Sequence, residues 1–320
     1  EPQWFNLEWF GGAPPETEFE ADPFTTKWGQ NWGVPVYRWD EVEKSDFKWW
    51  KQRVGALTSI FHQFRIDHIL GFYRIYGFPW HPKRNGEFLP MSLDEASKVT
   101  GGELPGFVPR EDDTAVHKAL NLLDGDRYIR AVIDAAGSGE VIGEDLGTVP
   151  DYVRPHLQEI GVAGFKICHW ERDLRGKMIP PEAHPECSFA TYTTHDMAPL
   201  KSLWEDTRAA MEAGRKGADM ALKGLCQFSD MPVPRKGQAY PAYSQKVKNV
   251  LLDALMRTGS RYAAIQINEL VDSSVQTNLP GTVGDHNWTY RVNWEFGKQP
   301  KTVEREMQRL AKMIKASGRG

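Results

Sequence analysis

The stretch that decides the fold is Phe64-Arg65-Ile66-Asp67-His68-Ile69-Leu70-Gly71-Phe72. An apolar run that follows an amphipathic helix is typical of a buried strand, so the charged residues at its end must pair or point into a cleft. In an α/β barrel the carboxyl ends of the strands form the active-site face, and a carboxylate there indicates catalysis. The alternative is that Arg65 and Asp67 form a buried pair that only braces the barrel.

Two further apolar runs also end in acids, which favours a catalytic role for Asp67 over a structural pair with Arg65. They are Val141-Ile142-Gly143-Glu144-Asp145-Leu146-Gly147 and Phe189-Ala190-Thr191-Tyr192-Thr193-Thr194-His195-Asp196. Three such strand ends predict that Asp67, Glu144 and Asp196 meet around one barrel mouth. Like charges that converge cost stability unless they take part in chemistry.

The alternation of strands and helices predicts βαβ units, a parallel sheet and the α/β class. The five predicted strands lie around Asp67, Glu144, Phe165, Tyr192 and Ile265. A closed (β/α)₈ barrel needs eight strands. The sequence therefore predicts part of such a barrel.

Other segments give predictions about single elements. Residues 1–45 are rich in Pro, Gly and aromatic residues without a helical period, which predicts a long functional loop. A helix is predicted from Asp46, its N-cap, to about Gln63, and another over residues 126–136. Residues 83–125 hold scattered Gly and Pro with short helical patches, and we interpret them as an insertion beside the mouth of the site.

Composition bounds the class of protein. A chain of 320 residues that is 40% hydrophobic can bury a substantial core. A net charge of -4 without a long basic run argues against nucleic acid or an anionic membrane as partner. No apolar segment approaches the ~20 residues that cross a bilayer. The three cysteines cannot all pair within the chain and lack zinc-ligand spacing, which favours a reducing cytoplasm.

The acidic segments, in their order along the chain, resemble those of the 4-α-glucanotransferases, also called amylomaltases or disproportionating enzymes, which belong to glycoside hydrolase family 77 of the α-amylase clan. Near the start, the resemblance includes Gly12-Ala13-Pro14-Pro15 and Gly29-Gln30-Asn31-Trp32-Gly33-Val34-Pro35-Val36-Tyr37-Arg38-Trp39. Near the end, it includes Asn278-Leu279-Pro280-Gly281-Thr282 and Asn287-Trp288-Thr289-Tyr290-Arg291. The resemblance thus covers nearly the whole chain.

The resemblance implies a TIM barrel of the amylase type. Residues 1–320 would form the C-terminal portion of this catalytic barrel, about strands 4 to 8, with loop and helical insertions. The nucleophile strand of the family is the fourth, so three strands are expected before residue 1. We therefore expect residues 1–320 alone to be poorly stable and inactive.

The resemblance also implies the catalytic residues. Asp67 matches the nucleophile, Glu144 the general acid/base, and Asp196 the third acid that stabilises the charged transition state. Retaining chemistry needs the first two carboxyl groups about 5 Å apart. Glu144 must begin the cycle protonated, so we expect its neighbours, including the other two carboxylates, to raise its pKa. Arg65, on the same face of the strand as Asp67, is expected to keep Asp67 ionised.

A second set of residues is expected to bind sugar: Arg65, Trp32, Tyr37, His195, Asn287 and Trp288. For any single aromatic ring, core packing is the alternative. We expect His68 to support the packing of its loop and Asp145 to be structural. An Asp67-His68 pair without a third ligand at metal spacing predicts no metal, and no cofactor is expected.

The predicted function is a cytoplasmic 4-α-glucanotransferase that acts on malto-oligosaccharides or an α-1,4-glucan and a glucose or glucan acceptor. One alternative is an α-glucan hydrolase, because the same acids serve when water reaches the intermediate. Another is a non-catalytic glucan-binding protein that kept the fold.

Overall fold

The computed structural model describes residues 2–16, 22–215, 217–235, 237–280, 282, 284–295 and 297–319. The chain divides into two compact units, Glu1–Gly164 and Phe165–Gly320, and each is described by itself. Gly281, part of the motif quoted near the end of the chain, lies outside the described residues. In the part of the chain that the structure describes, no helix is long and apolar enough to cross a membrane.

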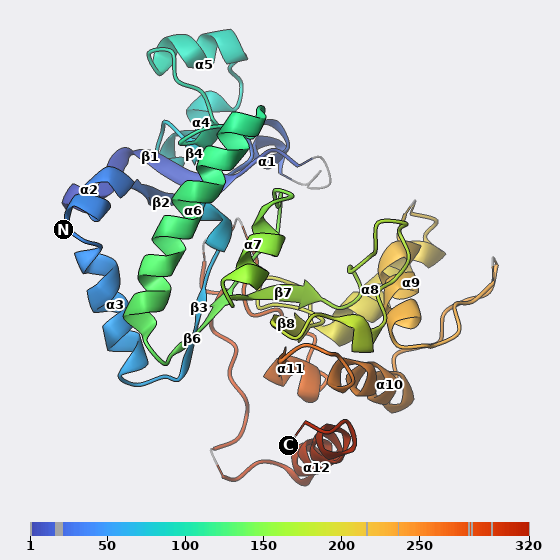
Figure 1. Cartoon of the computed structure of the whole chain (residues 1–320). Coiled ribbons are helices and arrows are strands. Elements are labelled where there is room, and N and C mark those ends of the chain that lie inside the picture. The colour runs from blue at the N-terminus through green and yellow to red at the C-terminus, as the bar shows by residue number, and fades with distance from the viewer. Residues whose placement is uncertain are drawn as a thin grey trace. The chain divides into compact units, whose positions relative to one another are not determined.

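The first unit contains an antiparallel sheet and a parallel sheet with their helices (Figure 1). Its strands are β1 (Phe5–Ala13), β2 (Gln30–Tyr37), β3 (Gln63–Ile66), β4 (Ile75–Phe78), β5 (Gly106–Val108), β6 (Glu140–Gly143) and the start of β7 (Ala163–Ile167). Its α-helices are α1 (Pro23–Trp28), α2 (Trp39–Lys44), α3 (Lys48–Thr58), α4 (Asn85–Phe88), α5 (Leu93–Val99), α6 (Ala115–Ala136) and α7 (Val153–Glu159). Short 3₁₀ helices are η1 (Pro2–Trp4), η2 (Ile69–Phe72) and η3 (Pro82–Arg84).

The parallel strands of this unit carry the predicted acids at their ends. β3 pairs with β6 in parallel, with Ile66 opposite Gly143, and β6 pairs with the start of β7. The helices α3 and α6 lie side by side next to these strands (Figure 1). They bury Trp50, Val54 and Ile129 in the same apolar core as Phe64 of β3. This core fixes the strands whose ends carry the acids.

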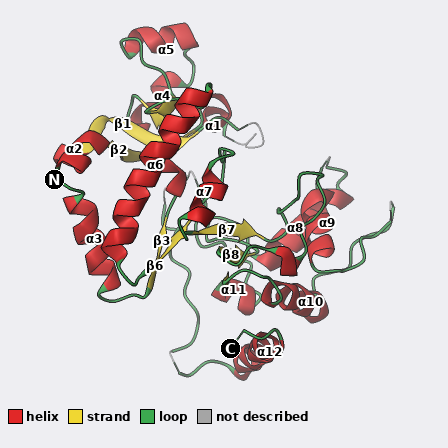
Figure 2. Ribbon diagram, in the orientation of Figure 1, coloured by secondary structure: helices red, strands yellow, loops and turns green. Residues whose placement is uncertain are grey.

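The N-terminal region corrects one prediction. Residues 1–45 were predicted to be a loop, but they contain β1 and β2, which join β4 and β5 in an antiparallel sheet of order β2-β1-β4-β5 (Figure 2). Gly12 in β1 permits this pairing, because a Cβ built there would lie 1.9 Å from the carbonyl oxygen of Gln30. Pairing with a distant strand thus overrides the local preferences of Gly and Pro.

Two helix boundaries also differ from prediction. The helix predicted from Asp46 to about Gln63 is α3, which begins at Lys48 and ends at Thr58, and its N-cap is Phe47. Asp46 lies one residue before this N-cap, and its carboxylate pairs with Lys51 at 2.7 Å. The second helix, predicted over residues 126–136, begins at Ala115, so the region 83–125 ends inside α6. The predicted short helix within that region is present as α5.

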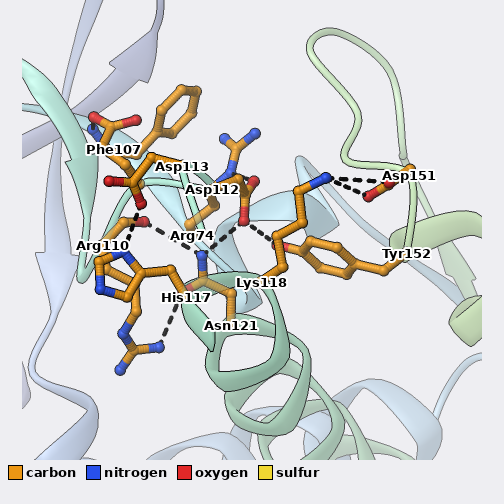
Figure 3. Close-up of polar contacts among 11 residues, drawn as sticks. Arg74, Phe107, Arg110, Asp112, Asp113, His117, Lys118, Asn121, Asp151 and Tyr152 are labelled. Carbon is orange, nitrogen blue, oxygen red and sulfur yellow. Dashed lines mark hydrogen bonds and ion pairs between the residues drawn. The ribbon is translucent and has the colours of Figure 1, made fainter. Parts of the chain in front are cut away.

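A polar network attaches the chain before α6 to its surroundings (Figure 3). Asp112 accepts hydrogen bonds from Arg74, from Asn121 at 3.0 Å and from Tyr152 at 2.9 Å. Arg74 is 6% exposed, and its guanidinium carbon lies 3.5 Å from the centre of the Phe107 ring. Burial raises the pKa of Asp112, but the hydrogen bonds outweigh it and lower this pKa below its ordinary value.

The second unit combines the rest of the parallel strands with four longer helices. Its strands are the remainder of β7, β8 (Ser188–Thr191) and β9 (Tyr262–Ala263), and β8 pairs with β9 in parallel. Its helices are α8 (Leu200–Glu212), α9 (Asp219–Phe228), α10 (Gln245–Met256), α11 (Ile267–Leu270), α12 (Lys301–Ala316) and the 3₁₀ helix η4 (Pro181–Ala183). The five predicted parallel strands are therefore present as β3, β6, β7, β8 and β9.

Candidate active site

The first pair of predicted acids lies at the ends of two neighbouring strands. Asp67 directly follows β3, and Glu144 directly follows β6. Because the last residues of these parallel strands are paired, both carboxyl groups emerge at the same edge of the sheet. The structure thus brings Asp67 and Glu144 together, as the sequence predicted.

Arg65 connects the two carboxyl groups. Its Nη2 atom lies 2.6 Å from Oδ1 of Asp67 and 3.8 Å from Oε2 of Glu144. These two distances limit the separation of the carboxylate oxygens to a range that includes the about 5 Å of retaining glycosidases. The side chain of Asp67 is 75% exposed, whereas that of Glu144 is 11% exposed. The two acids therefore share one cation but differ strongly in their access to water.

The pKa of Glu144 differs from that of an ordinary carboxyl group. Burial raises its pKa, and the negative charge of Asp67 adds to this effect. The backbone amides of His68 and Leu146, each donating at 2.8 Å, and the charge of Arg65 oppose the rise without cancelling it. The predicted direction of this pKa shift is confirmed.

His68 supports this arrangement through its backbone and its ring. Its left-handed conformation (φ 45°) turns its amide towards Glu144. Its ring contacts the ring of Trp32 edge-on, with the centroids 4.9 Å apart. Burial lowers the pKa of His68 to about 4, so the ring is uncharged at neutral pH. The packing role predicted for His68 agrees with these contacts.

A cavity of about 900 Å³ in the first unit reaches these residues. Arg65, Asp67, His68 and Trp32 are among the residues that line it. Its volume lies in the range of pockets that hold small ligands. Trp32 is 39% exposed, so part of its ring is open to a ligand.

Tyr37 also lines the cavity, but most of its contacts are with other rings. It packs against the rings of Phe5, Trp39, Trp49 and Trp50. Burial raises its pKa to about 12. These contacts favour the packing alternative for Tyr37 over sugar binding.

Asp196 belongs to the second unit and is not at the end of a strand. The strand β8 ends at Thr191, and Asp196 lies five residues later in a turn, contrary to prediction. The hydroxyl of Thr191 donates to the carbonyl oxygen of Thr193 at 2.9 Å, which stabilises the departure from the strand. The strand was predicted to extend beyond Thr191 because the next residue, Tyr192, is apolar and is also buried in the core.

A cluster around Asp196 joins segments that are far apart in the sequence. Nε2 of His195 lies 3.1 Å from Asp196, and the side-chain amide of Asn278 donates to the same carboxylate. The backbone amide of Asn278 donates to the carbonyl oxygen of His195 at 3.0 Å. The side-chain amide of Gln276 donates to the carbonyl oxygen of Asp196 at 3.0 Å. Asn278 and Gln276 were not predicted as site residues. The signal for Asn278 was its place in a quoted motif.

Trp288 and Asn287 have different surroundings in the same unit. Trp288 is 59% exposed, and its ring lies 4.9 Å from that of His195 at an angle of 41°. The side chain of Asn287 accepts from the amide of Leu279 at 2.8 Å and donates to the carbonyl of Thr282 at 3.0 Å. The polar atoms of Asn287 are thus used inside its own loop, whereas Trp288 presents an open ring.

Within the described ranges, no group of three or more His, Cys, Asp and Glu residues is arranged to hold a metal ion.

Comparison with known proteins gives three kinds of similarity. A family model described as 4-alpha-glucanotransferase matches residues 1–296. The 4-alpha-glucanotransferase of Chlamydia caviae is 28% identical over 304 residues, which are 91% of this chain and 47% of that protein. The rice 4-alpha-glucanotransferase DPE2 is 40% identical over 104 residues, which are 32% of this chain and 10% of that protein. The chain spans about half the length of most of the curated relatives it matches.

A solved structure shows the fold. The amylomaltase from Streptococcus agalactiae in complex with acarbose superposes with a TM-score of 0.66 at 20% identity, covering 100% of this chain and 54% of that chain. The fold is therefore a partial TIM-barrel-like α/β fold, as predicted. The numbering of its strands as 4 to 8 stays a prediction.

Proposed function

Because the chain belongs to the 4-alpha-glucanotransferase family, we propose that it transfers a segment of an α-1,4-glucan to the 4-hydroxyl of an acceptor glucose or glucan. Malto-oligosaccharides serve as donors, and the reaction retains the configuration of the anomeric carbon through a covalent glycosyl-enzyme. No metal or cofactor takes part in this scheme.

Asp67 is the nucleophile and Glu144 the general acid/base of this double displacement. The carboxylate of Asp67 attacks the anomeric carbon while Glu144 gives its proton to the departing 4-oxygen of the glucan. In the second step Glu144 takes the proton from the acceptor 4-hydroxyl, which attacks the anomeric carbon and releases Asp67. Asp196 is the third acid, which stabilises positive charge at the transition state.

The observation that carries this proposal is the contrast between two carboxyl groups beside one guanidinium. Glu144 is buried with a raised pKa, which suits a group that must begin protonated. Asp67 is exposed and paired with Arg65 at 2.6 Å, which suits an ionised nucleophile. Pairs of titratable groups in contrasting environments are typical of acid and nucleophile assignments.

Sugar binding is assigned to groups in each unit separately. In the first unit, the exposed ring of Trp32 and the donors of Arg65 line the cavity beside Asp67. In the second, His195 and the open ring of Trp288 lie beside Asp196. The Streptococcus agalactiae amylomaltase was solved with acarbose, which makes acarbose a suitable probe of this binding.

We place the reaction in the cytoplasm. Cys168 and Cys226 are buried thiols, and burial raises the pKa of Cys226 to about 11. Buried thiols of low reactivity suit a reducing compartment.

The test uses Asp67→Asn and Glu144→Gln in this protein, with maltotriose as donor and acceptor. Asp67→Asn should lower transfer by roughly a thousandfold or more while acarbose binding changes little, because only the covalent step is lost. Glu144→Gln should slow transfer by roughly 10²–10⁴-fold, yet spare glycosyl-enzyme formation from a donor whose leaving group needs no proton.

The matched control is Glu140→Gln, at the opposite end of β6, which should leave transfer unchanged. Activity of Asp67→Asn within tenfold of wild type, about 1.4 kcal/mol in the barrier, would exclude Asp67 as nucleophile. Equal losses with good and poor leaving groups would exclude Glu144 as the acid. Product analysis separates transfer from hydrolysis, because transfer redistributes chain lengths without new reducing ends.

A further inference from the structure

Glu269 is a buried acid that the proposed reaction does not use. It lies in the one-turn helix α11 of the second unit and is 2% exposed. The strand predicted around Ile265 is shorter than expected, because β9 ends at Ala263 and the chain then forms α11. A buried carboxylate must have hydrogen-bond partners, so its partners indicate what it does.

One of its partners lies at the start of the segment that carries His195 and Asp196. The hydroxyl of Thr193 donates to Oε1 of Glu269. Thr193 precedes His195 by two residues, so this carboxylate holds the backbone that leads into them.

The direction of the hydrogen bonds shows that an acceptor is required at residue 269. The side-chain amide of Gln266 donates to the hydroxyl of Thr193 at 2.6 Å and to the carbonyl oxygen of Thr194 at 2.9 Å. Because an amide nitrogen only donates, Thr193 must accept from Gln266 and give its own proton to Glu269. The backbone amide of Gln266 donates to Oε2 of Glu269 at 3.1 Å. Both oxygens of this carboxylate therefore accept a hydrogen bond.

We propose that Glu269 is a positioning residue, whose ionised carboxylate fixes the segment that presents His195 and Asp196. This inference rests on the proposed function for its catalytic consequence, but not for its structural one. Without the carboxylate, Thr193 loses its acceptor, and the turn that follows it is free to shift. Small displacements of groups that position substrate or charge lower turnover strongly.

The titration of Glu269 gives this role a signature. Burial raises its pKa to about 7, while its hydrogen bonds and the charge of Lys248 oppose the rise. The other titratable groups that interact with it or with Lys248 are Cys168, Tyr192, Tyr243, Asp272 and Glu306. Protonation of Glu269 removes an acceptor, so the segment should loosen as the pH falls through about 7.

The experiment compares Glu269→Gln with the wild-type protein by two readouts. The first is amide hydrogen exchange of residues 194–198, which we expect to become at least tenfold faster in the variant. The second is the pH profile of maltotriose transfer, in which kcat should fall at least tenfold while KM changes less than threefold. The decline of the wild-type kcat below about pH 7 should disappear in Glu269→Gln, because glutamine does not titrate.

Matched variants separate positioning from a general loss of stability. Glu95→Gln removes the corresponding carboxylate from the capping box of α5 and should leave both readouts unchanged. Thr193→Val should also show the faster exchange, whereas Thr193→Ser, which keeps the hydroxyl, should exchange at the wild-type rate. If Glu269→Gln fails to fold, the comparison of these two variants tests the positioning role.

Unchanged exchange of residues 194–198 in Glu269→Gln, or equal exchange in Thr193→Val and Thr193→Ser, would overturn the inference. An unchanged kcat and pH profile in an active enzyme would do the same. If the wild-type protein transfers no glucan, the proposed function fails, and the exchange measurement still tests whether Glu269 fixes the segment.

Discussion

Arg65 lies close to two carboxyl groups of unequal burial. It pairs with Asp67 at 2.6 Å, and its charge lowers the pKa of Glu144, but burial outweighs this effect and raises that pKa. The pKa of Glu144 is therefore a balance between burial, two backbone amides and one arginine.

This balance predicts the result of Arg65→Gln. The pKa of Glu144 should rise further, because a charge that lowered it is gone. Glu144 then stays protonated to higher pH, so the basic limb of the kcat/KM profile for maltotriose should move to higher pH. The rate itself should fall by roughly 10- to 100-fold, the value of a lost charge-assisted hydrogen bond to Asp67.

The control is Arg154→Gln, because Arg154 lies 3.1 Å from the neighbouring acid Asp145. This substitution should leave the basic limb in place. A basic limb of Arg65→Gln that stays still or moves to lower pH would show that Glu144 is not the group that titrates there.

The sequence predicted part of this site for a clear physical reason. Residues two apart on a strand share a face, and parallel strands end at the same edge, so Arg65, Asp67 and Glu144 could be placed together. The amides that bind Glu144 could not be predicted, since they depend on the left-handed backbone of His68. Side-chain periodicity carries no information about that conformation.

The elements that the sequence missed are those made by distant pairing. The apolar runs of β3 and β6 identify buried strands by themselves, whereas β1 and β2 contain Gly and Pro and are stabilised by each other. The first half of α6, which was not predicted, is also stabilised by contacts outside the helix. It packs through Asn121, which is fully buried and forms hydrogen bonds with Arg110 and Asp112.

The contacts of Arg74 predict how these elements are held together. Arg74→Met should lower the free energy of unfolding at pH 7 by about 3 kcal/mol, because Asp112 loses a buried partner. The pKa of Asp112 is lowered in the folded protein, so the pair stabilises above the unfolded value of about 3.9 and loses its effect as the pH falls through the folded value. The difference between variant and wild type in urea unfolding should therefore shrink in acid.

The comparison includes two further variants. Arg53→Met removes an exposed arginine that lies over the ring of Trp49, and should cost less than about 1 kcal/mol. Asp112→Asn, added to Arg74→Met, should restore part of the stability. A double variant less stable than Arg74→Met alone would contradict the assignment of the cost to an unpaired carboxylate.

At the scale of the whole molecule, the open edge of β3 affects how the protein behaves on heating. Among the described residues of the first unit, β3 pairs with β6 and with no other strand, so one edge of β3 lacks the neighbour that a closed barrel would give it. Because an open strand edge can pair with another chain, we expect the protein to aggregate on thermal unfolding. Light scattering during the transition checks this, and a reversible, cooperative transition without scattering would refute the expectation.

The contact between Trp32 and His68 has an optical consequence. A neutral imidazole leaves the emission of an indole largely intact, whereas an imidazolium quenches it, and the lowered pKa of His68 keeps this ring neutral down to about pH 4. Trp32 is partly open and lines the cavity, so a ring that displaces water from its face would shift its fluorescence to the blue. The chain holds 12 tryptophans, and the difference spectrum against Trp32→Phe isolates this one. The protein thus carries a fluorescent reporter beside the carboxyl groups of its first unit.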